Sequence, residues 1–435
     1  MTTSVRVAAV ALWIGLSAYS LSAQQPAVLT VVQSGPTNEI QNLHEANEIR
    51  IVFSEPMVVL GRIPDPVTAP FVTIRPAIQG TFRWSGTTIL IFTPDPSRKL
   101  PNATQYDVSV DTSTVAVSGR RLAAPYRFSF TTPTVRLLAV DWYRKNKRYD
   151  SPMVVALRFN QPVRTADVIS HTTLKFDPHA FDAPVLSDAA QARLKTNDSQ
   201  ALARFQAKVA AAVNAASSAS PVRFMPAASW DTQRFRQSPD LVVLEVADTV
   251  PPDSWMMLAL DGNAPAVEGH AVPGETQSRR IEAEQTFFVD GVRCREECAP
   301  DEWNPIKLRG QIDLSAIQKF ISVRNITRPS PQPMVTTAKK PEHQDWEFDT
   351  PSHFSLEDAG YDRQPPNSKY VVRLDQALTA NDGQTLGYSW LEIVDNWHER
   401  AFTSFGDGHG VWEADGGTAL PFYSRNFKDV TQWSS

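Results

Sequence analysis

The sequence has few cysteines, little net charge and no hydrophobic run beyond its N-terminus that reaches membrane-spanning length. Its 42 lysines and arginines nearly balance 47 aspartates and glutamates, leaving a formal net charge of −5 over 435 residues. This balance excludes a basic nucleic-acid footprint as the main function of the protein. We therefore expect no nucleic-acid partner, and no transmembrane span in this segment.

Proline, by contrast, is abundant, with 33 residues against 19 glycines. Each proline fixes φ and removes a backbone N–H donor, so long uninterrupted helices cannot dominate the chain. Short strands with proline-punctuated turns fit better. The length suggests about three domains, and a hydrophobic fraction of 42% is enough to build their cores.

Residues 1–23 have the layout of a secretory signal peptide. Arg6 precedes an apolar run from Val7 to Leu16, and small residues up to Ala23 follow. The run is too short for a stable bilayer span, and no cysteine follows it to carry a lipid anchor. A buried N-terminal helix is the alternative interpretation. We expect a soluble, exported protein of the periplasm or cell envelope.

Export would place the two cysteines, Cys294 and Cys298, in an oxidising compartment. A structural disulfide across three intervening residues is the expected state. A metal pair would need two further soft ligands, and no histidine lies near in sequence. A redox pair usually has two intervening residues instead of three.

A strand-and-proline pattern recurs along the mature chain. The alternating strand Ile49–Phe53 is followed by Pro56, and Met153–Phe159 is followed by Pro162 in the same way. In the first and third units, a tyrosine is followed by Gly and Leu at offsets of 13 and 16: Tyr106, Gly119 and Leu122 correspond to Tyr370, Gly383 and Leu386.

Each unit is expected to close with an aromatic-rich strand: Phe128–Phe130, Phe287–Val289 and Phe402–Phe405. The side chains expected to point inward are Phe53, Phe92, Tyr106, Phe128 and Phe130 in the first unit, and Phe159, Leu244 and Phe287 in the second.

These patterns predict an all-β chain of tandem Ig-like or macroglobulin-like β-sandwich domains with one helical insertion. The expected divisions are a signal peptide at 1–23, sandwiches at 24–133, 134–295 and 296–405, and the truncated start of a further domain at 406–435. On this interpretation the chain is the front part of a longer protein.

The helical insertion is predicted at 187–216, where Leu202, Phe205, Val209 and Val213 fall at helical spacing. We expect a solvated segment of the second unit that packs on one sandwich face; a partner-binding helix is the alternative. A second irregular stretch, Arg328–Gln344, is rich in proline and indicates a long loop in the third unit.

Catalytic signatures are missing from the sequence. It has no His-Glu-x-x-His motif, no Gly-x-Ser-x-Gly elbow and no phosphate loop, and its eight histidines are scattered. The acidic pairs near Glu284 and Glu297 and the basic run from Arg144 to Arg148 are interpreted as surface charge. We therefore expect no enzyme activity, no cofactor and no metal.

Three stretches carry a resemblance to a known family: Ile51–Met57, Gly80–Trp84 and Thr88–Pro94. Together with Leu420–Asn426, which is similar to the entry strand of a macroglobulin domain, they resemble the N-terminal region of bacterial alpha-2-macroglobulins. The resemblance covers residues 27–435.

The family resemblance implies protease trapping. Members are large periplasmic proteins in which cleavage of a bait segment makes the molecule collapse around the protease, and many members hold a Cys–Gln thioester. Cys294 and Cys298 lack the Gly-Cys-x-Glu-Gln context, so no reactive residue is carried over. The resemblance implies a docking and structural arm of an inhibitor. Proteases would be the prey of the full-length protein, and an envelope partner is possible. The alternatives are a tandem Ig-like adhesin that binds the cell surface or wall, and the accessory part of a secreted hydrolase.

Overall fold

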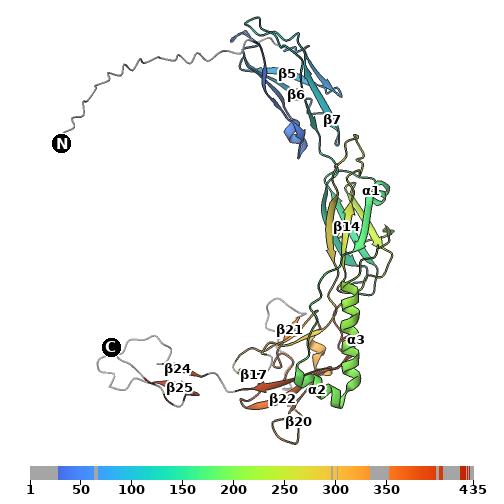
Figure 1. Cartoon of the computed structure of the whole chain (residues 1–435), viewed down its shortest axis with the longest axis vertical. Coiled ribbons are helices and arrows are strands. Elements are labelled where there is room, and N and C mark those ends of the chain that lie inside the picture. The colour runs from blue at the N-terminus through green and yellow to red at the C-terminus, as the bar shows by residue number, and fades with distance from the viewer. Residues whose placement is uncertain are drawn as a thin grey trace, which may run out of the picture. The chain divides into compact units, whose positions relative to one another are not determined.

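The computed structural model describes residues 28–62, 67–294, 297–300, 302–333, 352–397, 401–404, 422–427, 429 and 431. The predicted signal peptide at 1–23 lies outside the described residues. So do residues 334–344 of the predicted loop and most of the predicted further domain at 406–435. The predicted fold class is confirmed, because the described chain is mostly β, in several sheets that form Ig-like sandwiches, with a few short helices (Figure 1).

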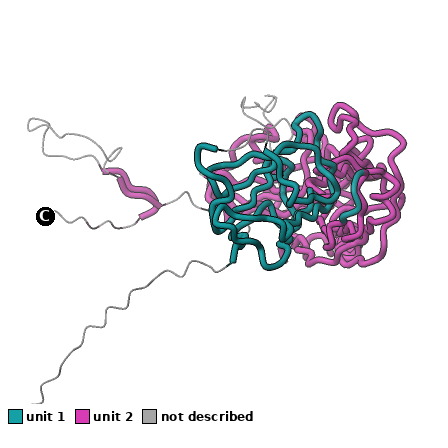
Figure 2. Tube along the Cα trace, turned by 90° about the horizontal axis from the view of Figure 1, so that it is seen from above, with its two compact units in different colours: residues 1–134, 268–271 teal, residues 135–267, 272–435 magenta. Residues whose placement is uncertain are grey.

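The chain divides into two compact units, coloured separately in Figure 2. Unit 1 comprises residues 1–134 together with Glu268–Ala271, and unit 2 comprises the remainder. The sheets of the second and third sandwiches both fall within unit 2.

The first sandwich has two four-stranded sheets. One sheet has the order β1 (Val31–Gly35), β3 (Ile49–Phe53), β6 (Ile89–Pro94), β5 (Gly80–Ser85). The other has the order β2 (Asn38–Glu39), β8 (Tyr126–Thr131), β7 (Gln105–Val110), β4 (Val72–Arg75), and a short 3-10 helix covers Leu43–Ala46. Alternation in β3 buries Ile49, Ile51 and Phe53 between the sheets, as a half-exposed strand requires.

The second sandwich has a four-stranded and a three-stranded sheet. Their orders are β12 (Phe224–Pro226), β13 (Leu241–Val246), β10 (Met153–Phe159), β9 (Leu137–Arg144), and β11 (Thr172–Phe176), β14 (Trp255–Leu260), β15 (Gln277–Glu282). Helix α1 (Thr165–His171) leads into β11. The apolar strand β10 is buried on both faces except at Arg158, which suits a central position.

The third sandwich pairs a small sheet with a larger one. The small sheet has the order β16 (Val289–Val292), β18 (Ile306–Leu308), β21 (His353–Phe354). The larger has the order β17 (Glu297–Cys298), β23 (Trp390–Asn396), β22 (Ser368–Leu374), β19 (Ile321–Asn325), β20 (Gln332–Pro333), and a 3-10 helix covers Leu314–Lys319. Beyond it, β24 (Phe402–Ser404) pairs with β25 (Tyr423–Arg425).

The predicted helical insertion forms two helices, α2 (Asp188–Asn197) and α3 (Ser199–Ala216). Ser187 caps α2 by accepting a hydrogen bond from the Ala190 N–H, and Asp198 caps α3 through the Ala201 N–H. The two helices pack on a sandwich, as expected, but on the third sandwich instead of the second, in which the insertion was placed. Apart from Ala216, the buried residues of α2 and α3 belong to one core with the third sandwich, in which Phe205 packs against Phe288 and Tyr388.

Two of the predicted closing strands are also placed differently. Phe287 and Phe288 are buried in the third-sandwich core, and Val289 begins β16, which pairs with β18. The last strand of the second sandwich is therefore β15. Phe402–Ser404 pairs with Tyr423–Arg425 instead of closing the third sandwich, whose last strand is β23. An aromatic strand pattern records burial but does not identify the partner strand.

Most of the side chains expected to point inward do so. Phe53, Phe92, Tyr106, Phe130, Phe159, Leu244 and Phe287 are buried, whereas Phe128 is half-buried. Phe287 is buried in the third sandwich instead of the second, because the strand that follows it, β16, pairs with β18 of the third sandwich.

The equal offsets from Tyr106 and Tyr370 reflect the same turn structure. Gly119 and Gly383 have φ of 83° and 86°, a left-handed conformation that glycine adopts without strain. The bridges Val115–Arg121 and Thr379–Thr385 close the two turns at matching positions. The second sandwich repeats this pattern with Met256 in place of the tyrosine and Gly269, with φ of 69°, at the same offset.

Candidate functional site

The cysteines named from the sequence lie at the edge of the five-stranded sheet of the third sandwich. Cys294 and Cys298 are joined by a disulfide, with Cα atoms 5.1 Å apart. Cys298 is fully buried, β17 pairs with β23 in parallel, and the Cys298 carbonyl accepts a hydrogen bond from the Trp397 N–H at 3.0 Å. These contacts anchor a short edge strand, which is a structural role.

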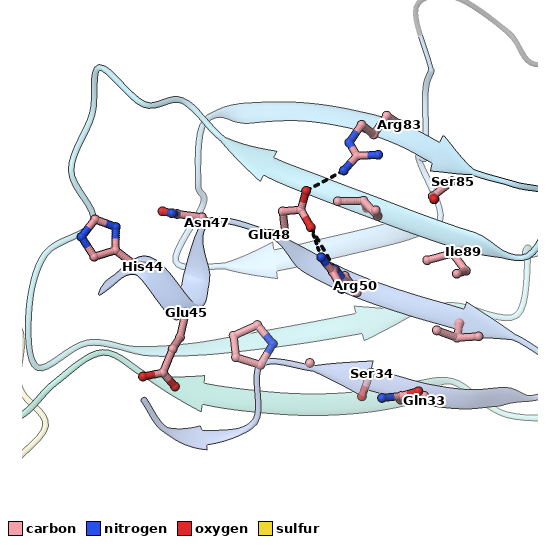
Figure 3. A pocket seen from close by; sticks show the side chains of 14 residues that line it. Gln33, Ser34, His44, Glu45, Asn47, Glu48, Arg50, Arg83, Ser85 and Ile89 are labelled. Carbon is pink, nitrogen blue, oxygen red and sulfur yellow. Dashed lines mark hydrogen bonds and ion pairs between the residues drawn. The ribbon is translucent and has the colours of Figure 1, made fainter. Parts of the chain in front are cut away.

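A concave depression of about 670 Å³ lies on the outer face of one sheet in the first sandwich (Figure 3). Its floor is Ile91 on β6, which pairs in register with Arg50 on β3 and Arg83 on β5. Although Ile91 is on the outward face, it is buried. We attribute this to the aliphatic stems of the two arginines, which can cover apolar surface while their charged ends stay in water.

The charges of this depression are already paired. The Glu48 carboxylate binds both Arg50, at 2.9 Å from Nε, and Arg83, at 2.5 Å from Nη2. The hydrogen bond from Arg50, and then that from Arg83, hold the pKa of Glu48 below its usual range. Glu45 accepts hydrogen bonds from the backbone of Gln41 and Asn42. The face can receive a polar segment, and the carboxylates of Glu45 and Glu48 are both held by hydrogen bonds within it.

The most extensive set of specific contacts joins α2 and α3 to the third sandwich. Phe205 packs edge-on against Tyr388, with ring centroids 5.0 Å apart. Ser187 donates a hydrogen bond to the buried Glu392 at 2.5 Å, and Arg373 pairs with Asp198 at 2.9 Å. Burial raises the pKa of Glu392, and the Ser187 and Ile393 donors partly offset that shift.

Lys208 on α3 forms two hydrogen bonds to the third sandwich. Its Nζ donates hydrogen bonds to the carbonyl oxygens of Thr385 at 2.7 Å and Leu386 at 2.9 Å, and it lies 5.2 Å from the centroid of the Phe288 ring. Burial lowers the pKa of Lys208 to about 8, against a smaller opposing effect of Asp382. The amine therefore satisfies the carbonyls of Thr385 and Leu386 at the end of a turn.

The chain between the second and third sandwiches is held by Gln384. Its side-chain oxygen accepts a hydrogen bond from the Phe287 N–H at 2.9 Å, and its amide donates to the Gln285 carbonyl at 2.8 Å. Nearby, the Tyr149 N–H donates to the Asp382 carbonyl at 3.0 Å. This junction was not predictable from the sequence, because its partners are about a hundred residues apart or more.

Two groups expected to be surface charge form a largely buried ion pair. Arg144 and Glu284 are 2.6 Å apart, and their side chains are 8% and 17% exposed. Arg144 also donates to the carbonyls of Ser151 and Val250. The expectation of solvated surface charge is wrong for these two residues, because β9 carries Arg144 inward at the end of its sheet.

The histidines remain dispersed. His44 lines the depression on the first sandwich, His171 bonds to Asp261, His179 stacks on Trp255 at 3.8 Å, and His353 packs against Trp303. His343, His398 and His409 lie outside the described residues. Within the described ranges, no group of three His, Cys, Asp or Glu side chains could hold a metal ion, and no helix is both long and apolar enough to span a membrane.

Comparison with known proteins adds one family match. Residues 25–132 match the model of a bacterial Ig-like domain, which covers the first sandwich. A search of curated protein sequences finds no match.

Several solved structures are similar over most of the chain. The MG0-NIE-MG1 fragment of Escherichia coli alpha-2-macroglobulin is 10% identical, with 84% of this chain and 97% of that chain covered and a TM-score of 0.19. Salmonella alpha-2-macroglobulin reacted with methylamine is 12% identical, with 88% and 27% covered and a TM-score of 0.19. The S-layer protein rSbsC is 10% identical, with 87% and 43% covered and a TM-score of 0.17. At TM-scores this low, the similarities carry no argument about function.

Proposed function

We propose that this chain is the N-terminal arm of an exported protease-trapping inhibitor of the bacterial alpha-2-macroglobulin type. In this role the arm positions and docks the remainder of the protein and performs no catalysis itself. The resemblance of Ile51–Met57, Gly80–Trp84 and Thr88–Pro94 to that family motivates the proposal. The match of residues 25–132 to a bacterial Ig-like domain is compatible with an extracytoplasmic location.

The observation that carries the structural role is the shared core of unit 2. Helices α2 and α3 leave the second sandwich and contribute to the core of the third, while Gln384 and Asp382 bind the chain between and beside them. Two sandwiches joined only by a linker would be expected to move relative to each other. The core that α2 and α3 share with the third sandwich opposes that motion. An arm that positions the rest of a protein needs such rigidity.

The paired charges of the first-sandwich depression agree with the same role. Glu48 pairs with both Arg50 and Arg83 on an open sheet face, and the three side chains do not converge on a reacting group. Catalytic sites keep an acid, base or nucleophile with a perturbed pKa available to substrate. In the described residues, the perturbed groups Lys208 and Glu392 are occupied in joining α2 and α3 to the third sandwich.

The proposal is tested by protease protection. Residues 24–435 and the complete protein of which we propose they are part are each incubated with broad-specificity proteases. Cleavage of a large protein substrate and of a small peptide substrate is then measured. We expect the complete protein to protect only the large substrate, and the isolated arm to protect neither.

The possible results distinguish the parts of the proposal. Stoichiometric protection of the large substrate by the arm alone would contradict the division of labour. Absence of protection by the complete protein would contradict protease trapping. Export is tested separately, by fusing residues 1–23 to a reporter that is active only outside the cytoplasm.

A further inference from the structure

The small sheet of the third sandwich exposes a hollow of about 400 Å³ on its outer face. Ile306, Leu308 and Phe354 face the core, so the alternating positions Lys307 and His353 point outward, where they are direct cross-strand partners. Arg293 and Trp303 complete the hollow from the chain between β16 and β18. We call these four residues and Asp290 the third-sandwich groove.

The groove is elongated. Asp290, Arg293 and Lys307 also line an adjoining depression of about 660 Å³, which extends to residues 182–187 ahead of α2. Asp290 further lines a third hollow of about 410 Å³. Shared walls make these hollows continuous, so the surface suits a chain of linked units better than a single small molecule.

One wall of the groove is an exposed aromatic ring. The Trp303 side chain is 51% exposed, and its ring packs edge-on against His353 with centroids 5.2 Å apart. The loop that presents it is fixed by hydrogen bonds from the Asn304 side chain to the Ala299 and Glu302 carbonyls and from the Arg293 N–H to the Pro305 carbonyl. A large apolar side chain held in water by an ordered loop indicates a contact surface.

The groove also carries two exposed cations. Among the described residues, neither Arg293 nor Lys307 forms an ion pair, whereas neighbouring Arg309 is committed to Asp290 at 2.7 Å. One oxygen of Asp290 accepts that bond, so the other can accept a hydrogen bond from a ligand hydroxyl. The groove thus offers an aromatic face, two free positive charges and a hydroxyl acceptor.

We propose that the third-sandwich groove binds an acidic oligosaccharide. The C–H face of a sugar ring carries partial positive charge and packs on the negative face of an indole, here Trp303. Sugar carboxylates would pair with Arg293 and Lys307, and the guanidinium of Arg293 can hold a carboxylate through two parallel hydrogen bonds. Nucleic acid is a poorer match, because its binding usually needs several stacking aromatics and a broadly positive surface.

Binding is tested by titration calorimetry of the whole chain with hexagalacturonate as the acidic probe. Neutral chitohexaose and a hexathymidylate oligonucleotide are titrated in parallel. We expect binding of hexagalacturonate alone, weakening as salt is raised, since exposed charges are screened. Comparable binding of chitohexaose would overturn the charge assignment, and comparable binding of hexathymidylate would overturn the assignment to a saccharide.

Matched variants locate the site. Trp303→Ala and Lys307→Glu should each weaken binding by about tenfold or more. Trp397→Ala removes another exposed tryptophan, and Lys175→Glu makes the same charge change on an exposed lysine of the second sandwich; both should bind as the parent does. Equal binding by Trp303→Ala and the parent, or no binding of hexagalacturonate by the folded parent chain, would overturn the proposal. The proposed trapping role does not depend on either result.

Discussion

The cores of the first and third sandwiches differ in which segments of the chain supply their residues. Every residue of the first core comes from one stretch of chain, between Leu29 and Phe130. The third core extends from Phe287 to Val394 but also includes six buried residues of the preceding segment: Leu186, Ala190, Leu194, Ala201, Phe205 and Ala212. A repeated sequence pattern therefore does not guarantee a self-contained domain.

The difference has a physical cause in the sizes of the sheets. The first sandwich opposes two four-stranded sheets. The third opposes a five-stranded sheet with a small one whose strands have four, three and two residues. A sheet must bury its apolar face against another layer. The small sheet is too short to cover the whole apolar face of the five-stranded sheet. Helices α2 and α3 supply the missing cover.

Removing one aromatic ring from each core is the strongest test of this difference between the first and third sandwiches. Phe205→Ala should lower the free energy of unfolding of the third sandwich by about 3–5 kcal/mol, because it leaves a cavity among Phe288, Tyr388 and their neighbours. Phe130→Ala, the control, should cost a similar amount but in the first sandwich alone. Urea unfolding followed by limited proteolysis identifies which sandwich unfolds. Loss of the second sandwich without the third in Phe205→Ala would contradict the shared core.

The pH dependence of stability offers a second test through Lys208, whose pKa burial lowers to about 8 from 10.5. Between these values the unfolded chain binds a proton that the folded chain has released, so stability should rise with pH across this window. The rise should be at most about 3.5 kcal/mol, since the two pKa values differ by about 2.5 and one pKa unit corresponds to about 1.4 kcal/mol.

The variant Lys208→Met isolates this contribution. The stability difference between parent and variant, measured by urea unfolding from pH 7 to 11, should change in favour of the parent as pH rises from about 8. A difference that stays constant across the window would show that Lys208 keeps an ordinary pKa and is not buried against the third sandwich.

The disulfide should have a smaller effect, confined to the third sandwich. Replacing both Cys294 and Cys298 by alanine should destabilise it by no more than about 2 kcal/mol, because a loop this short restricts the unfolded chain only slightly. Urea unfolding of the parent with and without reductant should reproduce the result. A loss that matches Phe205→Ala would mean that the edge strand β17 is essential to the fold.

The smallest change in stability is expected from a substitution in the depression of the first sandwich. Glu48→Gln removes the carboxylate that joins Arg50 and Arg83, but exposed ion pairs contribute less than about 1 kcal/mol. Thermal unfolding at low and high salt measures the change, which should shrink as salt screens the charges. A salt-independent loss well above that range would indicate that the depression organises the first sandwich.

Local features were predictable from the sequence because they depend on neighbouring residues. Alternation at Ile49, Ile51 and Phe53 predicted a half-buried strand, and the spacing of Leu202, Phe205 and Val209 predicted a helix. The offset from Tyr106 to Gly119 predicted a repeat because a left-handed turn requires glycine there.

Long-range placements were not predictable in the same way. An apolar helix face shows that a helix is covered but not by what, so Phe205 was assigned to the wrong sandwich. Phe287 and Phe288 likewise indicated burial but not the sandwich in which they are buried. The roles of Lys208 and Gln384 depend on carbonyls and N–H groups about a hundred residues away or more, and composition carries no trace of them.

Hydrogen exchange on Phe205→Ala tests the shared core most directly. If α3 and the third sandwich form one cooperative unit, amides in α3, β22 and β23 should lose protection together, by a similar free energy. Amides in β7 and β8 of the first sandwich should exchange as in the parent. Loss of protection in α3 alone, with β22 and β23 unchanged, would show that the helices only rest on the third sandwich and would contradict this account.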